Sequence, residues 1–157
     1  MFWNIFGISF CALLIALDQF TKYLAKEYLS SPYVIIKNIL EFNYTTNMGM
    51  AFGMLQGGFW FLVPVTIVIL IGLIIYYIKI ENAKHTIWLR LSLVLISAGA
   101  VGNLIDRVKN KYVVDFIYFK LIDFPVFNVA DMCVVCGTFL LAFYIVFLTE
   151  SKEKGVL

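Results

Sequence analysis

Two aspartates stand in positions that ordinary surface residues rarely occupy. Asp115 lies within an apolar, β-branched and aromatic stretch, where aspartate is depleted. Asp131 is close to the start of another long apolar stretch. Two carboxylates near a membrane surface can share a proton, so that one acts as general base on water and the other as general acid. The sequence therefore offers Asp115 and Asp131 as a candidate catalytic pair.

The sequence gives little evidence for other common catalytic or binding chemistries. The single histidine, His85, lies in a short connection away from both aspartates, which argues against a histidine-activated nucleophile or a histidine-rich metal site. Cys11, Cys133 and Cys136 lie in apolar stretches, where a thiol behaves as a small hydrophobic group. The net charge of +2 is too small to indicate nucleic-acid binding. We expect no metal, no cofactor and no nucleic-acid partner.

The candidate pair must be positioned by membrane-spanning helices. The chain has 157 residues, of which 62% are hydrophobic and 14% are charged, far from the usual balance of a water-soluble domain. At about 20 residues per span, it can cross a membrane roughly four times. We expect a single integral membrane domain over 1–157, an α-helical membrane protein with four transmembrane helices at about 4–24, 59–78, 88–106 and 128–148. Arg90 is near enough to the end of the third span to reach water by snorkelling.

Two of the connections are rich in strand formers. We expect β structure within about 30–56 and 110–125, with Asn43–Gly49 forming a turn or loop. The connection 80–87 is short and polar. A small β-rich cap is therefore expected on one side of the membrane only.

Alternation of the four spans brings most of the polar residues to that same side. These residues are Asp18, Lys22, Asn103, Asp106, Arg107, Asp115, Asn128 and Asp131. The spacing pairs Asp18 with Lys22, pairs Asn103 with Asp106 and Arg107, and pairs Asn128 with Asp131. Small residues around Gly99 permit close helix contact. Because ionisable groups at membrane depth are costly, such a cluster requires an explanation.

Several of these residues also have purely structural interpretations. Asp18 with Lys22 is expected to be an interfacial ion pair, and Asp106 with Arg107 could be a surface pair at a helix end. Asn47 could be a turn residue. Asn128 could cap the fourth span, with or without a functional role.

Five blocks of the sequence resemble the motifs of the lipoprotein signal peptidases, the signal peptidase II family, in the same order and spacing. They are Asp18-Gln19-Phe20-Thr21-Lys22, Asn47-Met48-Gly49-Met50-Ala51-Phe52, Gly99-Ala100-Val101-Gly102-Asn103-Leu104-Ile105-Asp106-Arg107, Val113-Val114-Asp115-Phe116 and Phe127-Asn128-Val129-Ala130-Asp131. Each block alone is a weak pattern, but together they form a specific match.

The resemblance implies a four-helix bundle with an extracytoplasmic β-cradle and Asp115 with Asp131 as the catalytic dyad. It implies an aspartic endopeptidase of the bacterial cytoplasmic membrane that cleaves diacylglyceryl-modified prolipoproteins before the lipidated cysteine. Structural roles are implied for Asp18 and Lys22. Support of the dyad or the substrate is implied for Asn47, Gly99, Asn103, Asp106, Arg107, Asn128 and Ala130. The expected partners are diacylglyceryl-modified prolipoproteins and membrane lipid. We expect a monomer whose active site faces the extracytoplasmic side.

An alternative from another class is a small ion or proton pathway that uses the same two aspartates. Such a pathway would need polar groups through the whole bilayer, whereas the second and fourth spans are apolar in the halves farther from the polar cluster. A purely structural assembly partner would leave the aspartates unexplained. The positive charges do not support the implied orientation, because five Lys and Arg residues fall on the expected inner side and seven on the outer side.

Overall fold

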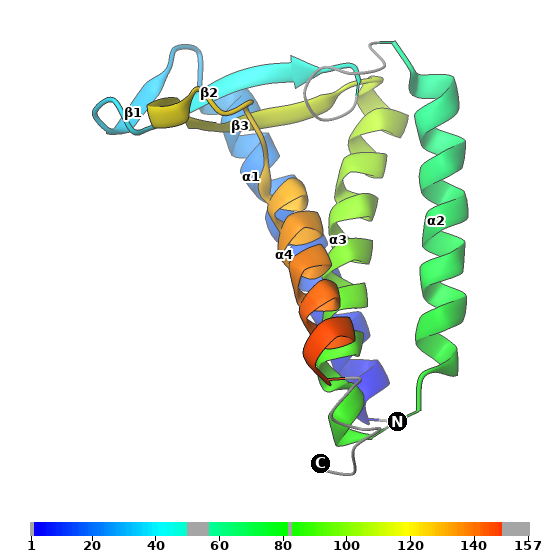
Figure 1. Ribbon diagram of the computed structural model, residues 1–157. Coiled ribbons are helices and arrows are strands. Elements are labelled where there is room, and N and C mark those ends of the chain that lie inside the picture. Colours follow the sequence, from blue (N-terminus) through cyan, green and yellow to red (C-terminus); the bar gives the residue numbers. More distant parts are fainter. Residues whose placement is uncertain (1, 50–56, 82, 149–157) are drawn as a thin grey trace.

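Figure 1 shows the computed structural model, which describes residues 2–49, 57–81 and 83–148. Four long helices, α1 to α4, run roughly along one direction, and a three-stranded sheet crosses one end of them. The β1 end of the sheet projects sideways, away from α2 (Figure 1). This architecture agrees with the fold class expected from the sequence.

The helices are α1 (Phe2–Tyr28), α2 (Phe59–Lys79), α3 (Ile87–Asn110) and α4 (Val129–Phe143), the last continued by a π-helical segment, Tyr144–Leu148. All four are long and apolar enough to cross a membrane. The first and third extend beyond the expected spans, since α1 continues to Tyr28 and α3 to Asn110. These extra turns carry polar side chains, which hydropathy alone would place outside a span.

Helix α3 is the centre of the bundle, because it contacts each of the other three helices. Two glycines of α3 permit this close packing. A Cβ at Gly99 would collide with the carbonyl oxygen of Ala130 in α4, and a Cβ at Gly102 would press on the carboxylate of Asp18 in α1. The expected role of small residues in this part of the third span is confirmed.

The antiparallel sheet has the order β1 (Tyr33–Ile36), β2 (Leu40–Asn47), β3 (Val113–Phe119). The expectation of a turn or loop over Asn43–Gly49 is wrong for its first part, because β2 continues to Asn47 and pairs with β3. Tyr44, Thr45 and Thr46 are aromatic or β-branched and suit a strand, whereas the flanking asparagines mimic a turn signal. Residues 50–56 of the expected β-rich segment lie outside the described residues.

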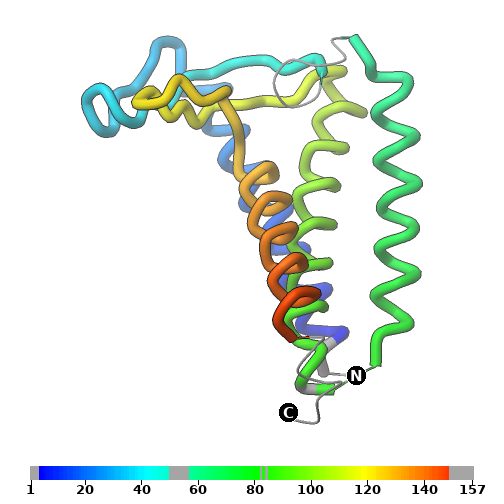
Figure 2. Tube along the Cα trace, in the orientation of Figure 1, coloured from blue at the N-terminus to red at the C-terminus, as the bar shows by residue number. Residues whose placement is uncertain are grey.

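The chain between α3 and α4 runs out along the sheet and then returns (Figure 2). Helix α3 ends where Lys111 adopts a left-handed conformation, and β3 follows directly. On the return, Phe127 bridges back to Ile117 of β3. This bridge holds the start of α4 beside the middle of β3, and so brings two distant parts of the sequence together.

Arg90 behaves differently from the expectation. Its side chain is buried within the protein, only 5% exposed, and does not snorkel to water. It donates hydrogen bonds to Asn4 Oδ1 at 2.8 Å and to the carbonyl oxygen of Ile80 at 2.6 Å. The reason is tertiary, because α1 and the connection after α2 supply acceptors that hold the guanidinium inside the protein.

Candidate active site

The strand register places Asn47 beside Asp115. Thr45 pairs with Asp115 and Asn47 with Val113, so Asn47 and Asp115 lie diagonally on one face of the β2–β3 ladder. Asn47 Nδ2 donates a 3.1 Å hydrogen bond to Asp115 Oδ2. Asn47 Oδ1 also accepts from the backbone N–H of Gly49 at 2.9 Å, which fits the turn role considered for it.

The first turn of α4 places Asp131. Asn128 is the N-cap, and its Oδ1 accepts from the backbone N–H of Asp131 at 2.9 Å. In return, Asp131 Oδ2 accepts from the backbone N–H of Asn128 at 3.1 Å, which completes a capping box. The expected capping role of Asn128 is confirmed, and the box fixes the direction of the Asp131 carboxylate.

Asn128 also links the two aspartates. Its side-chain Nδ2 donates to Asp115 Oδ1 at 2.6 Å, while its Oδ1 is held by the Asp131 backbone. Asn103 completes the link from α3, because its Nδ2 donates to Asp131 Oδ1 at 2.8 Å and its Oδ1 accepts from Asn128 at 3.1 Å. Asn103 thus pairs across helices, not with Asp106 and Arg107 as its spacing indicated. Helix α3, strand β3 and helix α4 meet in one hydrogen-bonded network.

A buried ion cluster supports this network from α1. Lys22 Nζ lies 2.9 Å from Asp18 Oδ2, 3.2 Å from Asp106 Oδ2 and 2.8 Å from Asn103 Oδ1. The pairing of Asp18 with Lys22 is confirmed, but it is buried and not interfacial, with both side chains at most 3% exposed. Asp106 also belongs to this cluster. The alternative that Asp106 and Arg107 form a surface pair at the end of the helix is therefore wrong. These buried ion pairs and hydrogen bonds of Lys22 hold α1 and α3 together.

The same carboxylates bind backbone groups near the dyad. Asp18 Oδ1 accepts from the N–H of Ala130 at 2.8 Å, and Asp106 Oδ2 accepts from the N–H of Val114 at 3.0 Å. Val114 and Ala130 immediately precede Asp115 and Asp131 in the chain. The ion cluster therefore positions the backbone on which both aspartates are carried.

Gln19 is a member of this cluster that the sequence interpretation did not select. Its Nε2 lies 3.2 Å from Asp18 Oδ2, 3.1 Å from the carbonyl oxygen of Gly102 and 3.2 Å from Asp106 Oδ1. The only sequence feature that pointed to Gln19 was its position in the first motif block, next to Asp18. Its hydrogen-bonding role could not be inferred from the sequence, because two of its partners, Gly102 and Asp106, lie on α3.

Asp115 and Asp131 line a large cavity between the sheet and helices α2, α3 and α4. Its volume is about 1060 Å³. Five of the expected site residues line it: Asn47, Asn103, Arg107, Asp115 and Asp131. The rest of its lining includes apolar side chains of α2, α3, α4 and the segment before α4: Ile69, Ile96, Phe124, Val126, Phe127, Val134 and Val135. The remaining expected site residues, among them Gly99 and Ala130, lie behind this lining at the helix contacts.

Arg107 also lines this cavity. Its Nη2 donates a 3.0 Å hydrogen bond to the carbonyl oxygen of Gly49, so it connects α3 to the segment that follows β2. The guanidinium is partly buried and has further donors. It is therefore placed to hold both the chain near Asn47 and a bound group.

The electrostatic environment of Asp115 suits proton transfer near neutral pH. Burial, and then the negative charge of Asp131, raise the pKa of Asp115 from 3.8 to about 6, although hydrogen bonds from Asn47 and Asn128 partly oppose the shift. Asp115 is 3% exposed, so its charge is poorly solvated. A pair of this kind titrates as a unit, and the raised pKa of Asp115 makes its protonated form more accessible at neutral pH than that of an ordinary aspartate.

Among the described residues, no group of three or more His, Cys, Asp or Glu is arranged to hold a metal ion. Cys133 is buried and Cys136 is exposed, and both are free thiols. The arrangement is thus one of two carboxylates, three amides and a guanidinium around a cavity. Such a set can activate water without a nucleophilic side chain.

Comparison with known proteins decides the family. The family model described as signal peptidase (SPase) II matches residues 10–147. The chain belongs to the signal peptidase II family. It is 44% identical over 145 residues to a protein named lipoprotein signal peptidase from Brevibacillus brevis, covering 91% of this chain and 95% of that protein. A protein of the same name from Clostridium novyi is 46% identical over 143 residues, covering 88% of this chain and 94% of that one.

Solved structures support the fold of this signal peptidase II family member. One, described as a bacterial membrane enzyme, superposes with a TM-score of 0.82 at 34% identity and covers 94% of this chain and 90% of that chain. A second, with the same description, gives a TM-score of 0.80 at 33% identity, with 90% and 92% covered. The chain is a multi-pass membrane peptidase, and the family resemblance seen in its sequence is confirmed.

Proposed function

We propose that Asp115 and Asp131 are the catalytic dyad with which this peptidase removes the signal peptide from diacylglyceryl-modified prolipoproteins, cutting at the amino side of the lipidated cysteine. The observation that carries the proposal is that Asn128 and Asn103 connect the two carboxylates and that both carboxylates line one cavity. The printed name of the relatives, lipoprotein signal peptidase, supports the substrate class.

In this mechanism the ionised carboxylate of the dyad accepts a proton from a water molecule. The hydroxide equivalent adds to the carbonyl carbon of the scissile peptide bond, while the protonated carboxyl gives its proton to the carbonyl oxygen. Collapse of the tetrahedral intermediate breaks the C–N bond. The carboxyl that took a proton from water gives it to the leaving amine of the lipidated cysteine, and a hydroxyl of the intermediate returns its proton to the other carboxylate as the new carboxyl group forms. The raised pKa of Asp115, about 6, makes the protonated carboxyl that this step requires more accessible at neutral pH than an ordinary aspartate would.

The amide side chains hold the dyad in position for these transfers. Each oxygen of Asp115 accepts from one amide, Oδ2 from Asn47 and Oδ1 from Asn128. We assign Asn47, Asn103 and Asn128 as positioning residues and Arg107, which lines the cavity, as a contact for the polar backbone of the substrate. Asp18, Lys22, Gly99, Asp106 and Ala130 support the site from behind, through ion pairs, backbone contacts and helix packing.

The shape and lining of the cavity fit a lipid-modified peptide. A volume of about 1060 Å³ is large enough for an extended peptide with part of an acyl chain, and it slightly exceeds the usual range for small-molecule sites. Apolar side chains of three helices would contact the signal sequence and the acyl chains. The polar end, at the dyad, would receive the scissile bond.

The ion-pathway alternative is not favoured. The family match and the named relatives identify a peptidase. In addition, the polar network described above lies at the sheet end of the bundle, whereas α2 and α4 are apolar along most of their length.

The test is cleavage of a synthetic diacylglyceryl-modified prolipoprotein by the purified protein in detergent. Asp115→Asn and Asp131→Asn should each abolish cleavage while thermal unfolding remains cooperative. The matched control is Asp123→Asn, the same chemical change at an exposed turn residue with φ of 50°, a conformation that Asn tolerates. Retention of near-normal cleavage by either dyad variant would refute the assignment, and failure of the wild-type protein to cleave would refute the substrate.

We also propose that the protein resides in the bacterial cytoplasmic membrane as a monomer, with the sheet and the dyad on the extracytoplasmic side. In a variant lacking the native cysteines, Lys37→Cys in the β1–β2 hairpin should react with a membrane-impermeant thiol reagent on intact cells. His85→Cys, at the opposite end of the bundle, should react only after lysis. The reverse labelling pattern would contradict the proposed orientation.

A further inference from the structure

The part of the dyad cavity that lies among the helices has the form of a trough. Figure 1 shows α3 between α2 and α4. Helix α3 contacts both of these helices, whereas over their described ranges α2 and α4 have at most marginal contact with each other. Helix α3 is therefore the floor of the trough, and α2 and α4 are its walls. The side chains that line it include Thr66, Ile69, Ile96, Ala100, Val135 and Cys136.

The side of the trough away from α3 is open. Ile69 of α2 and Val135 of α4 both line the cavity, yet each residue is 51% exposed. Cys136 lines the cavity and is exposed as well. Because α2 and α4 are long and apolar enough to cross a membrane, the opening between them faces lipid. A path therefore leads from the dyad sideways into the hydrocarbon of the bilayer.

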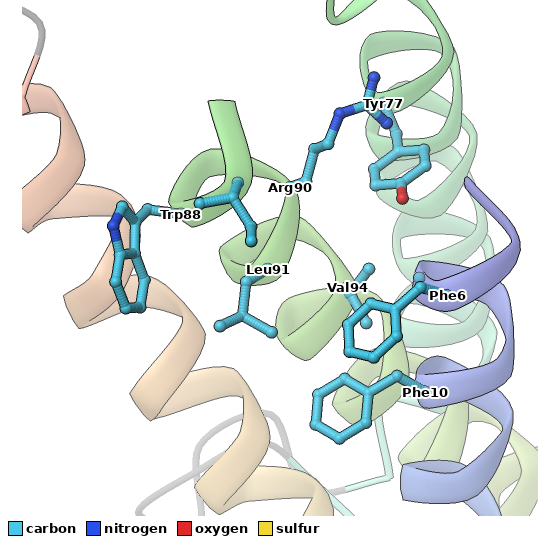
Figure 3. Close-up of a pocket in the computed structure, with 9 residues that line it drawn as sticks. Phe6, Phe10, Tyr77, Trp88, Arg90, Leu91 and Val94 are labelled. Carbon is cyan, nitrogen blue, oxygen red and sulfur yellow. The ribbon is translucent and has the colours of Figure 1, made fainter. Parts of the chain in front are cut away.

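Helix α2 is held at both of its ends, so this opening is not the result of a loosely attached helix. At the end far from the sheet, the guanidinium of Arg90 lies 4.9 Å from the ring centroid of Tyr77, and the two side chains meet in Figure 3. At the sheet end, Lys111 Nζ lies 4.0 Å from the ring centroid of Phe59. Both are cation–π contacts between α2 and the α3 side of the bundle. The middle of α2 is consequently fixed beside the opening.

The opening begins at the depth where the lipid of the proposed substrate leaves the peptide. Val135 and Cys136 follow Asp131 by four and five residues on α4, a rise of roughly 6–8 Å along the helix. The acyl esters of a diacylglyceryl cysteine begin about five single bonds beyond its Cα, roughly 6 Å when extended. With the scissile bond at the dyad, these esters reach the level of Val135.

The lining at this depth suits a hydrocarbon chain. Ile69, Ile96 and Val135 carry no polar group, and the hydroxyl of Thr66 already donates to the carbonyl oxygen of Leu62 at 2.8 Å. An extended stretch of the signal sequence in the same opening would bring backbone N–H and C=O groups that find no partners there. An acyl chain has no such groups to satisfy.

We propose that the opening between α2 and α4 is the subsite for the acyl chains of the substrate, and that Ile69 and Val135 set its preference for long chains. The chains pass through the opening into the lipid while the backbone of the modified cysteine stays at the dyad. This inference rests on the peptidase function proposed above and identifies the part of the site that recognises the lipid. Chains too short to reach Ile69 and Val135 gain no binding energy from it.

The first test compares cleavage of one prolipoprotein in dipalmitoyl and dibutanoyl forms. Ile69→Trp and Val135→Trp each narrow the opening and should lower kcat/KM for the dipalmitoyl form at least about tenfold, equivalent to losing the burial of about two methylene groups. Cleavage of the dibutanoyl form should be nearly unchanged, which also shows that the dyad remains intact. The matched controls are Ile71→Trp on α2 and Val146→Trp beyond α4, at residues that are 52% and 54% exposed and do not line the cavity.

A second test locates the chains directly. Prolipoprotein with a diazirine on the first few carbons of one acyl chain is bound to Asp115→Asn protein and irradiated, and the labelled residues are identified by mass spectrometry. Label within 66–69 or 132–136 is expected. Label confined to α1 or the sheet would overturn the proposal. Equal labelling by a diazirine phosphatidylglycerol that excess prolipoprotein does not displace would identify a general lipid site and would also overturn it.

The kinetic results can contradict the subsite without contradicting the peptidase. Normal cleavage of the dipalmitoyl form by folded Ile69→Trp and Val135→Trp proteins would overturn the subsite, as would wild-type cleavage that does not depend on chain length. Failure of the wild-type protein to cleave either form would instead refute the peptidase function, and the subsite with it. The two failures thus give different results.

Discussion

The side-chain amide of Asn128 donates a 2.6 Å hydrogen bond to Oδ1 of Asp115, while the same residue caps the helix that carries Asp131. One asparagine thus fixes a carboxylate on a strand relative to a carboxylate on a helix. Asn128 is fully buried, so this linkage is shielded from water. The separation of the two aspartates is consequently set by a residue between them and not by either element alone.

Removal of the Asn128 amide should therefore impair catalysis more than stability. We expect Asn128→Ala to lower kcat by about 10²-fold or more, the typical effect of removing one preorganised donor. Asn128→Ser should lower kcat equally but retain a cap oxygen for the Asp131 N–H, so it should lose less of the roughly 1 kcal/mol that a cap contributes. Steady-state cleavage and thermal unfolding of both variants check this. Asn110→Ala, outside the network, is the control, and wild-type kcat in Asn128→Ser would contradict the linkage role.

Lys22 should be essential for stability. Lys22→Met would leave the carboxylates of Asp18 and Asp106 buried without their cation, and breaking a buried pair in this way costs about 3–5 kcal/mol. We expect a large fall in the thermal unfolding midpoint in detergent. Lys26→Met, one turn further along α1 and exposed, should have little effect. Similar midpoints for the two variants would show that the cluster does not hold the helices together.

The stability of the protein should decrease as the pH rises from about 4 to about 6 and level off above that, because of Asp115. Its pKa is raised from 3.8 to about 6 in the folded state, so the folded state binds more protons between these values and ionisation at higher pH opposes folding. The contribution is fully favourable below about pH 4 and is lost above about pH 6, with a total of up to about 3 kcal/mol. Unfolding of the wild type and Asp115→Asn across pH 4–8 measures it. The variant should show a smaller decline, and parallel curves would exclude Asp115 as the cause.

Gly99 should be intolerant of even a methyl group. Its Cβ would meet the carbonyl oxygen of Ala130 and a methyl group of Val134, and backbone cannot move aside as a flexible side chain does. We expect Gly99→Ala to separate α3 from α4, lower the unfolding midpoint and reduce cleavage by displacing Asp131. The matched control is Gly72→Ala in α2, where no atom lies within 4 Å of the added carbon. That change should leave the midpoint equal or higher, since Ala favours helix more than Gly does.

The sequence alone determined the class of the protein and its family. Long uncharged stretches predict membrane-spanning helices because a lipid interior accepts no unsatisfied polar backbone. Five motif blocks indicated the family, and alternation of four spans brought the polar residues to one end. Local patterns also sufficed for the Asn128–Asp131 capping box and the Asp18–Lys22 pair, since both depend only on helical spacing.

Only the tertiary structure decided which of these polar residues contact one another. Spacing paired Asn103 with its neighbours on α3, but its partners are Lys22, Asn128 and Asp131 on other helices. Likewise, Arg90 turns inward to acceptors on α1 and after α2 instead of outward to water. Gln19 had no visible role until α3 was placed beside it. Hydrogen bonds between elements depend on helix rotation, strand register and close packing, and these follow from the whole set of contacts and not from any single segment.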